Sequence, residues 1–125
     1  MRMALIRRVD LWLPPLLLMA LIFYLSDQPD LDSGLGWIDS VGRKLVHVAE
    51  YALLCLLWWR LLRHMTSASR AALAAFVITS LYAAGDEYHQ SFVAGRHGSP
   101  LDWAIDTVGA ALVALHVRTR QRATA

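Results

Sequence analysis

Apolar residues in this chain fall into four long runs, and short polar stretches separate the runs. Each run is near the lower limit of the ~17–25 residues that cross the core of a bilayer, so we expect flanking residues to extend each helix by about one turn at either end. The pattern predicts an all-α protein, an integral membrane bundle of four transmembrane helices in a single domain covering residues 1–125. The expected spans are about residues 9–26, 44–63, 69–90 and 100–118.

Individual residues refine where these helices begin and end. Pro14 and Pro15 are expected near the start of the first helix, where a missing N–H donor costs least. The third helix is expected to continue through Gln90. Either Ser99 or Pro100 is expected to open the fourth helix.

The composition supports a membrane protein. Hydrophobic residues make up 57% of the chain and charged residues 18%, whereas average soluble domains carry about 25% charged residues. The mean hydropathy is +0.41. A soluble helical bundle would need polar faces along its helices, and the first and third runs have almost none. Cys55 is the only cysteine and lies in an apolar run, so we predict no internal disulfide and a buried, apolar role for this side chain.

Basic residues are distributed unevenly along the chain. Nine of the twelve Lys and Arg residues fall in the N-terminal segment, in the link between the second and third spans, and in the tail. In a four-span arrangement these three clusters lie on one side of the membrane. Because basic loops stay in the cytoplasm, the distribution predicts a multi-pass protein of the bacterial inner membrane with both termini cytoplasmic. Tyr24, Tyr88 and Trp103 then belong to the aromatic belt at the outer interface.

Ionisable and polar groups interrupt the second, third and fourth runs near their predicted outer ends. An ionisable side chain at the bilayer centre costs ~2.5–3.5 kcal/mol or more, so the direction that each one faces is informative. A helix turns about 100° per residue, which places these groups in one stripe on each helix. We expect the three stripes to face one another in a single cluster at the outer interface, with Lys44 and Arg96 balancing the carboxylates. The predicted binding residues are Lys44, His47, Glu50, Tyr51, Asp86, Glu87, His89, Gln90, Arg96, Asp102 and Asp106.

Three roles are open to such a cluster. It can be structural, although polar contacts between membrane helices average only ~0.6 kcal/mol each. It can bind the phosphate or carboxylate of a lipid headgroup, with Arg96 reaching the anion. It can also carry out acid–base chemistry, and whether the chain is an enzyme stays open. The candidate catalytic residues are His47, Glu50, Asp86, Glu87 and His89.

Several other functions are disfavoured. His47 and Glu50, like Asp86 and His89, have the i, i+3 spacing of metal sites in helical bundles. Lys44 nearby disfavours a cation, so we predict no metal, and no cofactor is indicated. The basic clusters are better explained by insertion polarity and anionic lipid than by a nucleic-acid partner, so we predict no nucleic acid. The inner halves of the helices lack polar residues, so no transport path is expected. The sequence does not indicate an oligomeric state.

The stretch LYAAGDEYHQSFVAGRHGSPLDWAIDTVGA resembles the signature of VanZ-like membrane proteins. In that family an Asp-Glu pair precedes His-Gln, an aromatic residue and Gly-Arg, followed by Asp, Asp-Thr and Gly. KLVHVAEYALL and YLSDQPD also match, and the resemblance covers about residues 11–117. Ala94 departs from the pattern, since a proline commonly precedes the Gly-Arg. The matching residues are Ser26, Gln28, Pro29, Lys44, His47, Glu50, Tyr51, Asp86, Glu87, His89, Gln90, Phe92, Gly95, Arg96, Asp102, Asp106, Thr107 and Gly109.

The resemblance implies a role in the cell envelope, because the namesake of the family is associated with glycopeptide resistance, specifically to teicoplanin. It implies no particular reaction, substrate or catalytic residue. We interpret the chain as a small membrane protein whose outward-facing polar site engages membrane lipid, through a lipid headgroup or a lipid-linked cell-wall precursor. The alternatives are a membrane enzyme, acid–base or metal-assisted, that acts on a lipid headgroup, and a purely structural polar cluster.

Overall fold

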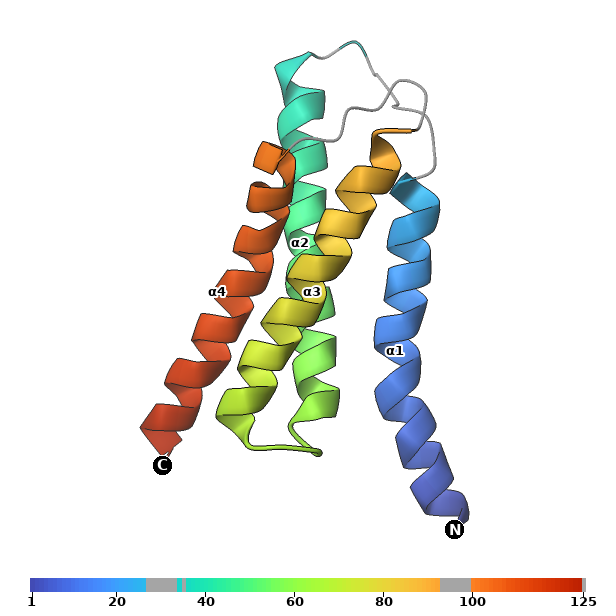
Figure 1. The fold of residues 1–125 in the computed structure, drawn as a ribbon, viewed down its shortest axis with the longest axis vertical. Helices are drawn as coiled ribbons and strands as arrows, with labels where there is room; N and C mark the ends of the chain where they lie inside the picture. Colours follow the sequence, from blue (N-terminus) through green and yellow to red (C-terminus); the bar gives the residue numbers. More distant parts are fainter. Residues whose placement is uncertain (27–33, 35, 93–99, 125) are drawn as a thin grey trace.

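The computed structural model describes residues 1–26, 34, 36–92 and 100–124, with the backbone alone at residues 40 and 122–124. The described residues form four helices and no strands, which confirms the predicted all-α fold (Figure 1). Each helix is long and apolar enough to cross a membrane. The helices are α1 (Arg2–Ser26), α2 (Trp37–Leu62), α3 (Ala68–Gln90) and α4 (Pro100–Thr124).

Three of the helices form a compact unit, and the first lies beside it. Helices α2, α3 and α4 all pack against one another, whereas α1 packs mainly on α2 and only slightly on α3. Figure 1 shows α1 and α4 on opposite flanks, and in the described residues these two helices do not touch. Both chain termini lie at the same end of the bundle, which we call the termini end (Figure 1). At the opposite end, α1 and α3 finish and α2 and α4 begin.

The core of the bundle combines large side chains from α2 with small ones from α3 and α4. Tyr51, Leu54 and Cys55 of α2 are fully buried, so the prediction of a buried Cys55 is confirmed. They face alanines, among them Ala83 of α3 and Ala110 of α4. Small residues let membrane helices approach closely, since there is no hydrophobic drive between helices in lipid. Large apolar side chains on the outer faces are exposed, as expected of surfaces that contact lipid.

Helix α4 approaches the backbone of α2 very closely at Gly109. A Cβ atom built on Gly109 would overlap the backbone carbonyl oxygen of Val48 and lie 3.1 Å from its carbonyl carbon. Only glycine fits this position without moving one helix. Gly109 follows Asp106 by three residues, and Val48 follows His47 directly. This contact therefore sets the separation of α2 and α4 beside the predicted polar cluster.

Both ends of α3 and the start of α4 agree with local sequence signals. The third helix ends at Gln90, as predicted, and its C-cap residue Ser91 donates a side-chain hydrogen bond to the carbonyl of Tyr88 at 2.6 Å. Ser67 caps the start of α3 by accepting from the backbone N–H of Arg70 at 3.4 Å. The fourth helix begins at Pro100, which is one of the two predicted positions.

The expected position of the two prolines was wrong. Helix α1 begins at Arg2, well before the predicted span, so Pro14 and Pro15 lie in the middle of the helix. Pro14 has no N–H to donate to the carbonyl four residues earlier, which belongs to Asp10. A nitrogen of the Arg60 guanidinium donates to this carbonyl at 3.3 Å, and the second nitrogen bonds Asp10 Oδ2 at 2.5 Å. Arg60 thus satisfies the carbonyl that the proline leaves open, and it ties α1 to α2.

This arrangement predicts that Arg60 and Pro14 are energetically coupled. Arg60→Ala is expected to lower the unfolding temperature in detergent, by an amount corresponding to about 1 kcal/mol, because one charge-assisted bond and one carbonyl contact are lost. In a Pro14→Ala background the new N–H satisfies the Asp10 carbonyl, so the same Arg60→Ala change should cost less. Additive effects in a double-mutant cycle would contradict the coupling.

Candidate functional site

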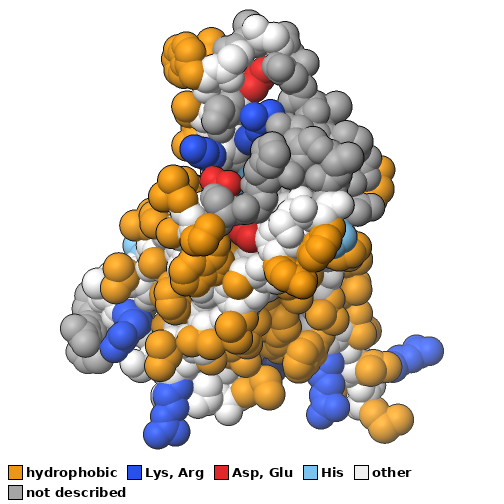
Figure 2. All heavy atoms as spheres, turned by 45° about the horizontal axis from the view of Figure 1, so that its top comes forward, with side chains coloured by type: hydrophobic (Ala, Val, Ile, Leu, Met, Phe, Trp, Pro, Cys, Tyr) orange, Lys and Arg blue, Asp and Glu red, His pale blue; other side chains and the backbone are white. Residues whose placement is uncertain are grey.

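The polar stripes of three helices lie in the half of the bundle opposite the termini. On α2 the stripe contains His47, Glu50 and Tyr51; α3 contributes Asp86 and Glu87. Asp106 belongs to α4, and all six groups are buried or half-buried. Figure 2 brings this end forward and shows acidic and basic side chains gathered here, with apolar side chains covering the flanks below. We call these six residues the polar cluster.

A short buried hydrogen bond links α2 to α3 in the polar cluster. The hydroxyl of Tyr51 donates to Asp86 Oδ2 at 2.6 Å. Tyr51 is 0% exposed and Asp86 5%, so this bond is shielded from solvent. The other oxygen of the same carboxyl group, Oδ1, is buried and has no hydrogen-bond partner in the described part of the chain. Of the two oxygens of the Asp86 carboxyl group, the described structure therefore provides a hydrogen-bond donor for only one.

His47 connects α2 to α4. Its Nδ1 atom lies 3.9 Å from Glu50 Oε2 on the same helix and 3.9 Å from Asp106 Oδ1 on α4. Asp106 is 3% exposed, and none of the residues that the structure describes forms a hydrogen bond with its Oδ2 atom. Glu87 of α3 lies within side-chain hydrogen-bonding reach of Asp106. One imidazole and three carboxyl groups from three helices thus meet in one place.

Two residues predicted for the cluster, His89 and Gln90, contact α1. The ring of His89 stacks on that of Phe23, with centroids 4.6 Å apart and an interplanar angle of 26°. Gln90 Nε2 donates to Ser26 Oγ at 3.2 Å, and both side chains are buried. The spacing correctly places both residues at the end of α3. Their contacts with Phe23 and Ser26 were not predicted, because the sequence prediction considered only α2, α3 and α4.

The family comparison can now be set beside this geometry. The model of the VanZ/LLP1 family matches residues 11–120. This chain belongs to the VanZ/LLP1 family. Searches of curated proteins and of solved structures found no match to it. Family membership and four helices able to span a membrane together describe a multi-pass membrane protein, and they confirm the resemblance found in the sequence.

Two basic residues, Lys44 and Arg96, were expected to balance the acids of this VanZ/LLP1 protein. Lys44 is exposed, and within the described ranges no Lys or Arg forms an ion pair with Asp86 or Asp106. Arg96 lies outside the described residues. Asp102, in the first turn of α4, is half-buried, four residues before Asp106. The described part of the site is therefore acidic in character.

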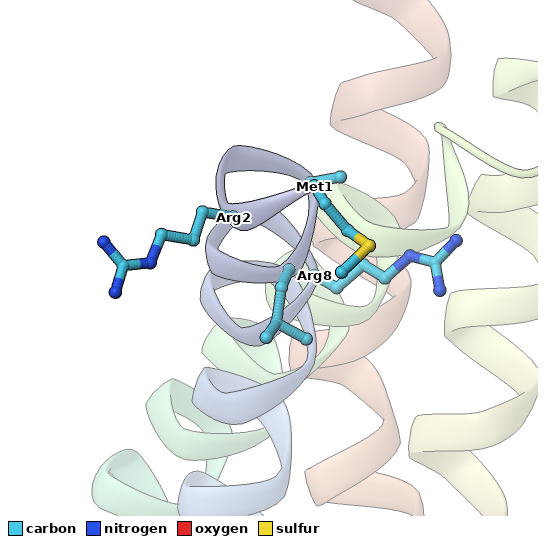
Figure 3. A pocket seen from close by; sticks show the side chains of 5 residues that line it. Met1, Arg2 and Arg8 are labelled. Carbon is cyan, nitrogen blue, oxygen red and sulfur yellow. The ribbon is translucent and has the colours of Figure 1, made fainter.

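Two other kinds of site, a metal site and an open pocket, were considered in the described part of this VanZ/LLP1 protein. The described residues contain no group of three or more His, Cys, Asp or Glu side chains placed to hold a metal ion. A pocket at the termini end is formed entirely by the start of α1, and Arg2 and Arg8 extend away from it on opposite sides (Figure 3). It lies at the opposite end of the bundle from the polar cluster, so we assign it no part in the site. Its lining residues are Met1, Arg2, Ala4, Leu5 and Arg8.

Sequence reasoning missed a polar seam between α3 and α4. The indole N–H of Trp103 donates to the backbone carbonyl of Ser80 at 3.0 Å, and Ser80 Oγ lies 3.4 Å from Thr107 Oγ1. The i, i+4 spacing of Trp103 and Thr107 was a usable signal, because it places both on one face of α4. Thr79, fully buried in the middle of α3, also shows that polar groups extend further along the helices than predicted.

Proposed function

We propose that this VanZ/LLP1 protein binds the headgroup of an envelope lipid, or of a lipid-linked cell-wall precursor, at the polar cluster. The observation that carries the proposal is the burial of Asp86, Glu87 and Asp106 from two helices beside His47 and Glu50 of a third. Buried carboxyl groups are costly unless they are hydrogen-bonded or paired. Pinning three helices together needs fewer groups than are gathered here, which favours a ligand.

The proposal places the polar cluster on the outer side of the bacterial inner membrane, with both termini in the cytoplasm. Support comes from the arginines of the N-terminal segment, of the α2–α3 link and of the tail, which belong to the termini end. Such clusters remain on the cytoplasmic side during insertion. An outer-leaflet site agrees with the association of the family's namesake with glycopeptide resistance, and we propose a binding or protective role in the envelope on that basis.

The orientation is testable by cysteine labelling. Cys55 is buried, so the native chain should react little with a membrane-impermeant maleimide. Ser33→Cys, between α1 and α2, is expected to label from outside on intact spheroplasts. Thr66→Cys, in the link between α2 and α3, is expected to label only after the membrane is opened. The reverse pattern would contradict the proposed orientation.

The lipid site is testable by native mass spectrometry of the purified chain. The protein is expected to retain a lipid that Glu50→Gln and Glu87→Gln each reduce by about tenfold, as for the loss of one charge-assisted hydrogen bond. Asp10→Asn is the control, because Asp10 belongs to the end of α1 that carries the N-terminus. If the cluster is only structural, the glutamine variants should lose thermal stability and abundance, while lipid retention per folded molecule stays unchanged.

The position of His47 favours one alternative, an enzyme that acts on the bound headgroup by acid–base chemistry. A histidine within 3.9 Å of two carboxyl groups is a suitable proton donor or acceptor. In that case incubation with the retained lipid should give a product of changed mass, and His47→Gln should stop product formation while lipid is still retained. An unchanged lipid mass in both proteins excludes this alternative.

A further inference from the structure

We infer that the polar cluster recognises a lipid headgroup by its primary ammonium group, whose N–H groups donate hydrogen bonds to Asp86 and Asp106. The phosphate of the same headgroup then lies on the side of the cluster nearer the N-terminus of α2. The inference rests on the proposed function, because it assumes that the cluster is a lipid site. It names the chemical class of that lipid as one with an ethanolamine-type headgroup.

The hydrogen-bonding pattern of the two aspartates carries the inference. Asp86 Oδ1 and Asp106 Oδ2 are both buried and find no hydrogen-bond partner among the described residues, and the two side chains are only 5% and 3% exposed. They come from different helices, and no described Lys or Arg pairs with either residue. A buried acceptor without a donor is unfavourable. What this part of the site lacks is therefore an N–H or O–H donor, preferably one with positive charge.

A primary ammonium group fits this requirement better than the other common headgroup components. It carries a positive charge and three N–H donors, enough for oxygens on both helices. A phosphate group would add negative charge to carboxyl groups that already lie close together. A quaternary ammonium is positive but has no N–H donor, and the hydroxyl groups of a glycerol headgroup donate hydrogen bonds without a charge. The three kinds of headgroup can therefore be told apart.

Lys44, on the N-terminal side of His47 in α2, suits the phosphate of the same headgroup. Lys44 is exposed and precedes His47 by three residues, which is about 4.5 Å of helix rise toward the N-terminus of α2. Arg43 is half-buried beside it. In an ethanolamine-type headgroup the ammonium and the phosphate are separated by a two-carbon link. In the inferred pose the ammonium lies at the buried aspartates and the phosphate lies on the side of Lys44.

Headgroup selectivity of the delipidated full chain tests the inference. Native mass spectrometry would compare short-chain phosphatidylethanolamine, phosphatidylcholine and phosphatidylglycerol with identical acyl chains. Phosphatidylethanolamine is expected to bind about tenfold tighter than either of the others, the difference made by one charge-assisted hydrogen bond. Asp86→Asn and Asp106→Asn should each remove this preference, and Asp10→Asn should keep it. Unfolding temperature and gel filtration establish that each variant is folded.

The ranking of the three lipids on the native chain decides the inference even if an asparagine variant fails to fold. Equal binding of all three, or tighter binding of phosphatidylglycerol, overturns the ammonium assignment. If the lipid that binds in such a result is lost in Glu50→Gln, the proposed function as a lipid-binding site is still supported. If no lipid binds more strongly to the native chain than to Glu50→Gln, the proposed function fails as well.

Discussion

Gly109→Val is expected to produce the largest loss of stability of any single substitution considered for this chain. An added Cβ would overlap the carbonyl oxygen of Val48, and that atom belongs to the backbone of α2. Backbone cannot rotate away as a side chain can, so α2 and α4 must separate. Overpacking costs about 1–3 kcal/mol where side chains can adjust, and we expect the upper part of this range or more here. The valine should lower both the unfolding temperature in detergent and the amount of protein in the membrane.

Gly85→Ala provides the matched control for this prediction. Gly85 also lies inside a helix, but a Cβ there meets nothing within 4 Å. Alanine is favoured over glycine inside a helix by about 0.5–1 kcal/mol, so this variant should be as stable as the native chain or more so. Gly109→Ala should fall between Gly85→Ala and Gly109→Val. Equal stability of all three proteins would show that α2 and α4 are not held at this contact.

The Gly109 contact also bears on the site. Asp106 is one helical turn before Gly109, and His47 directly precedes Val48. Their side chains approach to 3.9 Å because the two helices touch at the glycine. Any residue larger than glycine should therefore weaken lipid retention in the fraction that still folds. A loss of stability with unchanged retention would separate the packing role of Gly109 from the site.

The helices and the polar cluster were largely predictable from the sequence, for two physical reasons. Apolar runs near the length of a membrane span leave little choice of secondary structure, because backbone hydrogen bonds must be satisfied inside lipid. The rotation of about 100° per residue then fixes which polar groups share a face on each helix. Tyr51 of α2, Asp86 of α3 and Asp106 of α4 were brought together on this reasoning, and the structure places them in one cluster.

The features that were missed depend on contacts between helices or on helix starts. Helix α2 begins at Trp37, before the expected span, because half-buried Asp39, Arg43 and His47 continue a polar stripe at spacings of four residues. A search for apolar residues does not detect such an amphipathic turn. The packing of α1 against His89 and Gln90 could not be foreseen either. Spacing within one helix says which residues share a face, but not which neighbour covers that face.

Tyr51→Phe is expected to have the second largest effect on stability. It removes the hydrogen bond that the Tyr51 hydroxyl donates to Asp86 Oδ2. Because Oδ1 has no partner among the described residues, neither oxygen of this carboxyl group, in a residue that is 5% exposed, would then have a described donor. Leaving a buried acceptor unsatisfied costs about 1–3 kcal/mol. The unfolding temperature in detergent should fall accordingly. Tyr88→Phe is the matched control, since Tyr88 is 71% exposed and its loss of a hydroxyl should change little.

A double variant distinguishes the hydrogen bond from simple packing. Replacing both partners of a buried hydrogen bond by apolar groups can be nearly neutral, whereas removing one partner is not. Tyr51→Phe/Asp86→Leu should therefore be more stable than Tyr51→Phe alone, although it carries the additional substitution. The same double variant should no longer retain the lipid, because an acceptor of the proposed ligand is gone. A double variant less stable than either single one would mean that Asp86 contributes to the fold through contacts other than Tyr51.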